Sequence, residues 1–195
     1  MTLAAIVLAA GSATRFGADK LAAPFRGEPL VRHAIRAARA APVARVILVC
    51  PPGFEAGEWL GAHEWPAGPD LILAPLRSLA LSASLQAGIA AAGAIDGAFV
   101  FLGDMPLVPH GVAPRLAARL TDHFAAIPRH DGAWGHPVLL SARAFPAVAK
   151  LRGDEGAGRI LRQRDDLAFL DVESDAILID VDRPQDLARI AAQYP

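Results

Sequence analysis

The chain has 195 residues, of which 53% are hydrophobic and 20% charged, and its formal net charge is -1. This composition fits a compact folded protein rather than a disordered one, and the length suffices for one domain, residues 1–195, with its own core. A net charge near zero provides no basic field to attract nucleic acid. The single cysteine, Cys50, ends an apolar run and excludes an internal disulfide framework.

The chain has no apolar run of the roughly 20 residues that a membrane span requires. Its N-terminus is apolar from Leu3, but no basic region precedes it, and Arg15 and Lys20 interrupt it. We therefore expect a cytoplasmic protein with no membrane partner and no nucleic-acid partner.

Short apolar runs alternate with segments of helical period along the chain, which is typical of βαβ units and a parallel sheet. Strands are predicted at 3–9, 45–50, 70–74, 98–102, 124–128, 137–141, 167–171 and 177–179. Helices are predicted at 29–40, 78–92, 110–121, 155–164 and 184–193. The segment 51–70 is rich in Gly and Pro and is predicted to be a surface excursion. In open sheets of this kind ligands bind outside the carboxyl ends of the strands.

The first predicted strand leads into the loop 8-LAAGSATRFGADK-20. Gly11 and Gly17 permit unusual backbone conformations, and Arg15 and Lys20 are suited to phosphate oxygens. The spacing lacks the later glycines of the dinucleotide fingerprint and the Gly-Lys-Ser/Thr of a Walker loop. The loop is therefore either a phosphate cradle or an ordinary turn with solvated charges.

Carboxylates follow two later strands. Asp104 comes directly after an apolar run and Gly103, and Asp180 and Asp182 frame another strand end. Hard carboxylates at a sheet edge suit Mg²⁺ that is shared with phosphates. Alternatively, Asp104 caps the turn before Pro106 and Asp182 is a helix N-cap.

Two further loops are polar and compact. Gly135, His136 and Pro137 lead into a strand, and a lone histidine is more often structural than catalytic. In 152-RGDEGAGRIL-161, Asp154 and three glycines precede a helix. This second loop is predicted either to contact an anion or pterin, or to be an ordinary N-cap.

Taken together, these stretches resemble the molybdenum cofactor cytidylyltransferases, within the MobA-like NTP transferase superfamily. The pattern LAAGxSxRFGxxK matches Leu8 to Lys20, and the segment similar to LLPLxGKPLL is 21-LAAPFRGEPLV-31. The remaining matches, in order, are 82-SASLQAG-88, GDMPxV at 103–108, GHPVL at 135–139 and 180-DVDRPQDL-187. The matches span nearly the whole chain.

The resemblance implies a Rossmann-like three-layer α/β/α nucleotidyltransferase fold with a mostly parallel central sheet. It implies catalytic roles for Arg15, Lys20 and Asp104, and a Mg²⁺ ion, with Mn²⁺ as the alternative, on Asp104 and Asp182. The nucleotide would be bound by Leu8, Ala9, Ala10, Gly11, Ser12, Arg15, Lys20, Ser82, Ser84, Gly103 and Asp104. The acceptor would be bound by Gly135, His136, Pro137, Asp154 and Gly156.

The implied reaction transfers CMP from CTP to the terminal phosphate of molybdopterin and releases pyrophosphate. The implied partners are CTP, molybdopterin or molybdenum cofactor, and an apo-molybdoenzyme or its maturation chaperone. The chain departs from the family at 153-GDEGAG-158, where members often have GDxGAR, and at Arg183, which replaces a threonine. The departure at 153–158 affects the expected contact with the acceptor.

Three alternatives accompany this interpretation. The related guanylyltransferases resemble LAGG where this chain has 8-LAAG-11, so the methyl group of Ala10 favours CTP over the larger GTP. A cytidylyltransferase for another small phosphate ester is disfavoured because Pro24 is not followed by the Lys-Gln that completes the Pro-Lys-Gln of the methylerythritol-phosphate enzymes. A non-catalytic pterin or nucleotide carrier is favoured only by the altered 153–158 loop.

Overall fold

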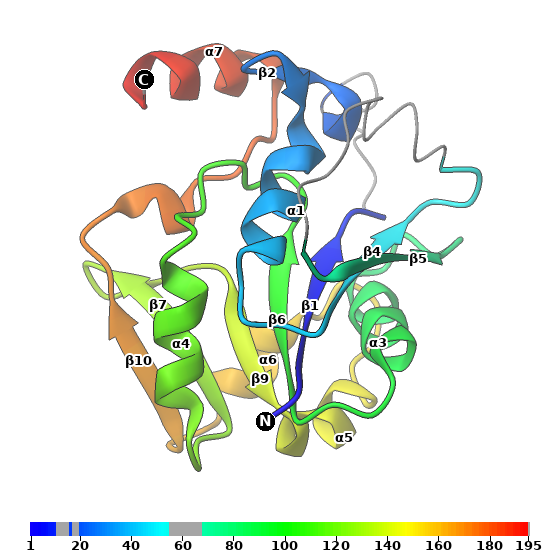
Figure 1. Cartoon of the computed structure of the whole chain (residues 1–195), viewed down its shortest axis with the longest axis vertical. Helices are drawn as coiled ribbons and strands as arrows, with labels where there is room; N and C mark the ends of the chain where they lie inside the picture. Colours follow the sequence, from blue (N-terminus) through cyan, green and yellow to red (C-terminus); the bar gives the residue numbers. More distant parts are fainter. Residues whose placement is uncertain (11–15, 17–19, 55–67, 195) are drawn as a thin grey trace.

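The computed structural model describes residues 1–10, 16, 20–54 and 68–194, and the structural statements below refer to them. In this part of the chain one eight-stranded sheet has the order β10-β7-β9-β6-β1-β4-β5, with β8 paired to β7 (Figure 1). Its strands are β1 (Leu3–Leu8), β4 (Arg45–Cys50), β5 (Asp70–Pro75), β6 (Gly97–Leu102), β7 (Ala125–His130), β8 (Ala133–Trp134), β9 (Val138–Ser141) and β10 (Leu167–Asp171).

The sheet is mostly parallel, as predicted. The central strand β1 runs parallel to both β4 and β6, whereas β9 is antiparallel to β6 and β7. Residues 3–7 of β1 are all buried, which explains why this strand is a continuous apolar run rather than an alternating one. Leu8 and Leu102 pair at the carboxyl ends of β1 and β6, so the loops that follow both strands leave the same edge.

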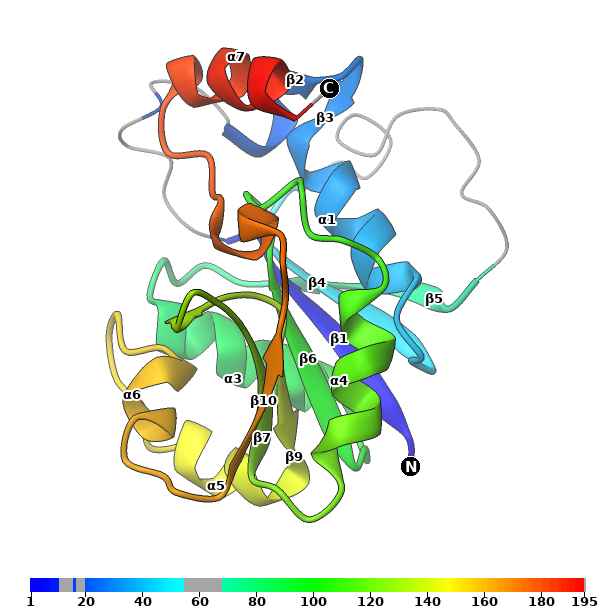
Figure 2. The same cartoon turned by 90° about the vertical axis from the view of Figure 1, so that its left-hand side faces the viewer.

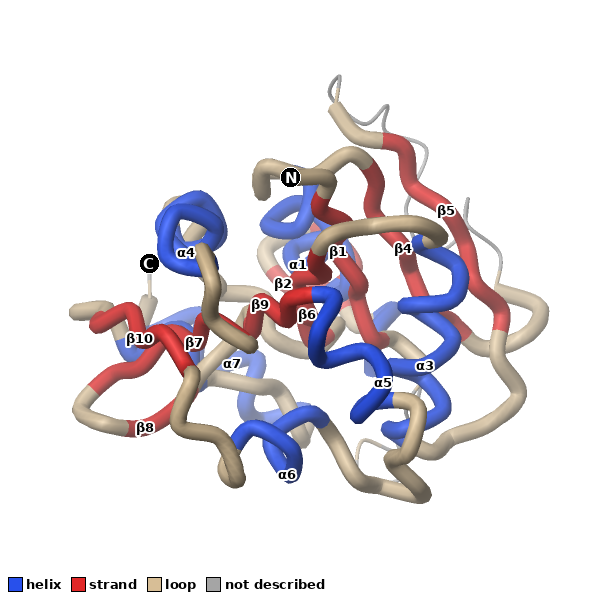
Figure 3. The backbone as a smooth tube through the Cα atoms, turned by 90° about the horizontal axis from the view of Figure 1, so that it is seen from below, coloured by secondary structure: helices blue, strands red, loops and turns tan. Residues whose placement is uncertain are grey.

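Helices cover both faces of the sheet (Figure 3). On one face lie α1 (Leu30–Arg39) and α4 (Val112–Leu120), and on the other lie α3 (Leu81–Ala92), α5 (Phe145–Val148) and α6 (Ala157–Leu161). Side chains of each set form separate buried clusters with the strands beneath them. The three-layer α/β/α arrangement expected from the sequence is therefore confirmed.

The last helix, α7 (Pro184–Gln193), lies apart from the sheet, beside the short hairpin of β2 (Pro24–Phe25) and β3 (Glu28–Pro29) (Figure 2). Phe25, Leu30, Val181 and Ile190 form the buried cluster that joins these elements. Pro184 opens α7, where its missing N–H costs no hydrogen bond. This small assembly stands beyond the carboxyl ends of β1 and β6.

The predicted strand at 177–179 is wrong, because the chain forms a 3₁₀ turn at Asp175–Leu178. The Ser174 hydroxyl accepts a hydrogen bond from the Ala176 N–H at 3.2 Å and starts this turn. Ile177 is fully buried within it, so the apolar run reflects burial and not strand pairing.

Most of the predicted helices are shorter than expected, and two of them begin only after a local turn. The helix at 78–92 begins only at Leu81, because the Ser78 hydroxyl accepts from the Ala80 N–H at 3.2 Å in a preceding turn. The helix at 155–164 is limited to Ala157–Leu161, and the Glu155 carboxylate accepts from the Arg152 N–H at 3.0 Å in the turn before it. Most of the excursion predicted at 51–70 falls in 55–67, outside the described residues.

No helix among the described residues is long and apolar enough to cross a bilayer.

Candidate active site

Asp104 is positioned by a close contact between the carboxyl ends of β1 and β6. The Gly103 N–H donates to the Leu8 carbonyl at 2.9 Å. A Cβ atom at Gly103 would lie 3.0 Å from that same oxygen, so glycine allows the two chain segments to approach. Asp104 follows immediately at the edge of the sheet.

Three charged side chains from distant parts of the sequence meet at this edge. The Lys20 Nζ donates to Asp104 Oδ2 at 2.7 Å and lies 3.7 Å from Asp182 Oδ1. The Lys20 side chain is 14% exposed, whereas that of Asp182 is 50% exposed. The ammonium group is thus held inside the site while one carboxylate remains open to solvent. Lys20, Asp104 and Asp182, which were singled out from the sequence, therefore lie together in the structure.

The segment that carries Asp182 is tied directly to Asp104. The Val181 N–H donates to the Asp104 carbonyl at 3.0 Å. Asp180 and Asp182, which flank Val181 in the sequence, are therefore held near Asp104. Burial, followed by the negative charges of Asp182 and Asp104, raises the pKa of Asp180. A carboxyl group perturbed by nearby carboxylates is a common feature of functional sites.

Asp182 is not the N-cap of α7, because Arg183 occupies that position. The capping interactions come from Asp186, whose Oδ2 accepts from the N–H groups of Asp182 at 3.0 Å and of Arg183 at 2.8 Å. The Asp182 carboxylate is therefore not used to begin the helix.

The arrangement fits a divalent cation that is shared with phosphates. Two carboxylates from separate segments converge on one positively charged atom, the Lys20 Nζ. Within the described ranges no group of three or more His, Cys, Asp or Glu side chains is placed to hold a metal ion. A cation on Asp104 and Asp182 would take its other ligands from phosphate oxygens and water, as Mg²⁺ commonly does.

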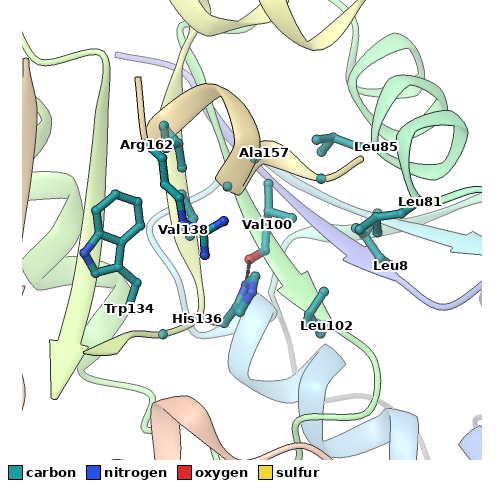
Figure 4. A pocket seen from close by; sticks show the side chains of 14 residues that line it. Leu8, Leu81, Leu85, Val100, Leu102, Trp134, His136, Val138, Ala157 and Arg162 are labelled. Atoms are coloured by element: carbon teal, nitrogen blue, oxygen red, sulfur yellow. Dashed lines mark hydrogen bonds between the residues drawn. The ribbon is translucent and has the colours of Figure 1, made fainter. Parts of the chain in front are cut away.

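A pocket adjoins this charged edge on the α3 and α6 side of the sheet (Figure 4). It encloses about 240 Å³ and its walls are mainly apolar. The residues that line it are Leu8, Leu81, Leu85, Val100, Leu102, Trp134, Gly135, His136, Val138, Gly156, Ala157, Gly158, Leu161 and Arg162. Leu8 and Leu102 are the strand ends that precede the charged edge, so the pocket lies next to that edge.

His136 is fixed in the pocket by backbone contacts. Its N–H donates to the Ile177 carbonyl at 2.9 Å, and its Nδ1 lies 3.2 Å from the Val100 carbonyl, which can only accept (Figure 4). Burial lowers the pKa of His136, against the opposing effects of the Val100 carbonyl, Asp104 and Asp180. The ring is therefore neutral near pH 7, with the proton on Nδ1 and the acceptor lone pair on Nε2.

The predicted acceptor residues are brought together only in part. Gly135, His136 and Gly156 line the pocket, and the peptide bond between His136 and Pro137 is cis. Pro137 and Asp154 are not among the residues that line it, and Asp154 is exposed.

Ser82 and Ser84 are both buried, and their hydroxyls bond to backbone carbonyls. The Ser82 Oγ donates to the Gly153 carbonyl at 2.8 Å, and the Ser84 Oγ donates to the Ala80 carbonyl at 3.3 Å. Ser82 therefore connects the start of α3 to the 153–158 loop. The contact of either serine with the base or ribose stays a prediction.

The loop after β1 is described only at its ends. Gly11, Ser12 and Arg15 lie outside the described residues, as does Gly17. Ala9 and Ala10 are 3% exposed, and Ala10 belongs to a buried cluster with Ile6 and Val49.

Among the pocket side chains that had not been singled out from the sequence are an aromatic one and a charged one. Trp134, on β8, lies with its ring centroid 5.6 Å from that of Phe169. Arg162 follows α6 and lines the same pocket. Their placement depends on two elements whose bounds could not be predicted. Only the spacing of Arg162, four residues after Gly158, was a usable signal, since it puts both on one face of a helix.

Residues 5–167 match the family model of the MobA-like NTP transferase domain. The chain is 30% identical over 192 residues to the purine catabolism protein PucB of Bacillus subtilis strain 168, covering 94% of this chain and 93% of that protein. It is 24% identical over 189 residues to the molybdenum cofactor cytidylyltransferase of Escherichia coli strain K12, covering 97% and 95% respectively.

Solved structures share the fold along the whole chain. Rv0371c from Mycobacterium tuberculosis H37Rv, in complex with manganese, superposes with a TM-score of 0.78 at 25% identity, covering 97% of this chain and 98% of that one. A protein similar to this chain therefore binds a divalent cation.

Proposed function

The chain belongs to the MobA-like NTP transferase family, and from this premise we propose that it transfers CMP from CTP to the terminal phosphate of molybdopterin. The product would be molybdopterin cytosine dinucleotide, with pyrophosphate released. The observation that carries the proposal is the convergence of Lys20, Asp104 and Asp182 at the sheet edge, beside an apolar pocket.

The nucleotide would lie over the carboxyl end of β1. Arg15 and Lys20 would bind the triphosphate, and Asp104 with Asp182 would hold a Mg²⁺ or Mn²⁺ ion. When bound, such an ion stabilises negative charge on phosphate oxygens. The Lys20 Nζ lies within 4 Å of both carboxylates. Because its side chain is flexible, a small movement would allow the ammonium group to leave the carboxylates and contact a phosphate oxygen.

The acceptor would occupy the pocket. An oxygen of its terminal phosphate attacks the α-phosphorus of CTP, the bond to the bridging oxygen of the β-phosphate breaks, and pyrophosphate leaves with that electron pair. A phosphate monoester is ionised near pH 7, so no side chain need remove a proton from it. The contribution of this chain is then alignment of two anions and neutralisation of their charge.

His136 would orient the acceptor rather than act in proton transfer. Its Nδ1 is engaged with the Val100 carbonyl, and its Nε2 can accept a hydrogen bond from an N–H or O–H group of the bound molecule. We place the reaction in the cytoplasm, in one domain of residues 1–195. The product would pass to an apo-molybdoenzyme or to its maturation chaperone.

The test measures pyrophosphate formation with molybdopterin and Mg²⁺, using CTP and GTP in parallel. We expect release that requires both acceptor and nucleotide and that is faster with CTP. Faster release with GTP would contradict the cytidylyl reaction and would indicate the guanylyl reaction on the same acceptor. Binding of both ligands without pyrophosphate release would indicate a carrier and would contradict catalysis.

A further inference from the structure

We propose that Arg162 binds the anionic group of the acceptor, in place of the arginine that the 153–158 loop lacks. This inference rests on the proposed function and deepens it, because it assigns the charge contact of the acceptor pocket. Gly158 stands where the related loops carry that arginine, and Arg162 follows it by one helical turn.

The Arg162 side chain lies within van der Waals contact of the place where a Cβ atom at position 158 would stand. The Arg162 N–H donates to the Gly158 carbonyl at 3.1 Å, so the helical spacing extends to this residue. A Cβ atom built on Gly158 would lie 3.8 Å from Arg162 Nη1. In Figure 4 the Arg162 side chain extends into the pocket toward His136, with the Trp134 indole on its other side.

Arg162 is also the only residue with a permanent charge among the described residues that line the pocket. Arg159, the arginine nearest to Gly158 in sequence, is paired with Glu155 and lines a different cavity. No carboxylate in the described part of the chain forms an ion pair with Arg162. Its guanidinium is therefore available to an anion that enters the pocket.

The remaining walls define the rest of the ligand. Leu81, Leu85 and Val138 are apolar, Trp134 offers an aromatic face, and His136 offers one hydrogen-bond acceptor. These side chains suit a ring system with an N–H or O–H donor and an anionic substituent. Molybdopterin belongs to this chemical class.

The first experiment uses anilinonaphthalene sulfonate, a ring system with one anionic group, whose fluorescence rises when it enters an apolar pocket. Arg162→Ala is expected to weaken its binding about 10-fold or more, because a charge-assisted contact is lost. The matched control is Arg159→Ala, which removes an arginine three residues away that faces another cavity. The control should bind the dye as the wild type does.

A charge-relocation variant, Gly158→Arg combined with Arg162→Ala, separates the charge contact from a packing effect. Among the described residues outside the neighbouring backbone, only Arg162 would lie within 4 Å of a Cβ atom at Gly158, and the double variant shortens that side chain. We expect this double variant to recover most of the lost dye affinity. The same three variants are compared for the molybdopterin KM, which should rise with Arg162→Ala while the CTP KM stays unchanged.

Two outcomes contradict the assignment of Arg162. These are unchanged dye binding in Arg162→Ala, or an equal loss in Arg159→Ala. Dye binding that depends on Arg162 but is not displaced by molybdopterin supports an anion site at Arg162 and contradicts the proposed acceptor. The two proposals can therefore fail separately.

Discussion

At the scale of single residues, the proposed reaction depends most on the negative charge of Asp104. Its carboxylate accepts a hydrogen bond from Lys20, and its backbone carbonyl accepts one from the Val181 N–H, next to Asp182. Asp104→Asn keeps the size of the side chain but removes its charge, so we expect kcat to fall about 100-fold or more. Initial rates of pyrophosphate release measure this loss. The control is Asp122→Asn, which changes an exposed aspartate after α4 and should leave the rate unchanged. An Asp104→Asn enzyme with nearly full turnover would refute the role.

We propose that base choice depends on another single residue, Ala10. Its methyl group is buried in the cluster that also contains Ile6 and Val49, directly beyond β1. Ala10→Gly removes this methyl group and would leave more room for a purine. We expect the ratio of kcat/KM for GTP to that for CTP to rise about 10-fold. Direct competition between the two nucleotides measures the ratio, and an unchanged ratio would assign base choice elsewhere.

The sequence singled out Asp104 because it comes directly after a buried strand, and Lys20 because it ends the loop that follows another strand. Asp182 was singled out from a predicted strand that the structure replaces with a 3₁₀ turn. The sequence did not choose between Asp180 and Asp182 as the metal ligand. The structure distinguishes their environments, since Asp182 contacts Lys20 while burial raises the pKa of Asp180. Arg162 could not be assigned from the sequence, because its relation to the pocket depends on where α6 ends.

At the scale of elements, the loop before β9 is held against the 3₁₀ turn at Asp175–Leu178. A Cβ atom at Gly135 would lie 2.5 Å from the Ile177 carbonyl oxygen. Gly135→Ala must therefore separate the two segments, and we expect the free energy of unfolding to fall by about 1–3 kcal/mol. Urea denaturation measures the loss. Gly111→Ala is the control, because its added methyl group meets no atom within 4 Å. Equal stability of the two variants would contradict the close contact.

The same turn shows why one predicted element was wrong. The run 177–179 is apolar and follows a polar stretch, which is the pattern of a short strand. Its backbone instead forms a 3₁₀ turn that begins with the hydrogen bond from the Ala176 N–H to the Ser174 hydroxyl. The Ile177 carbonyl accepts from the backbone N–H of His136 and not from a neighbouring strand. The local sequence pattern indicates that Ile177 is buried, but it cannot show that the segment of His136, far away in the sequence, packs against it.

At the scale of the whole molecule, His136 links the stability of the fold to pH. Burial lowers the pKa of His136 in the folded chain, although Asp104 and Asp180 favour the charged ring. The unfolded chain takes up the proton near pH 6.5 and the folded chain only at lower pH. The stabilising effect of this group is therefore complete above about pH 6.5 and is lost as the pH falls toward the folded pKa.

We expect the free energy of unfolding to decrease below pH 6.5 by at most about 1.4 kcal/mol per pH unit from this one group. Urea denaturation between pH 5 and pH 8 measures the slope. His136→Gln should reduce it, whereas His110→Gln, at an exposed position, should not. Equal slopes for the wild type and His136→Gln would show that the ring is not held neutral.

The order of strands, with α7 and the β2–β3 hairpin beyond the sheet edge, brings positions 20, 104 and 182 together from across the chain. The central claim is that this edge joins a nucleotide to the phosphate of an acceptor. Incubation with molybdopterin, Mg²⁺ and CTP labelled at the α-phosphorus tests it most directly. We predict that the label moves onto molybdopterin, with one pyrophosphate released for each label transferred. Label that stays in CTP, or that appears only in free CMP, would contradict the account.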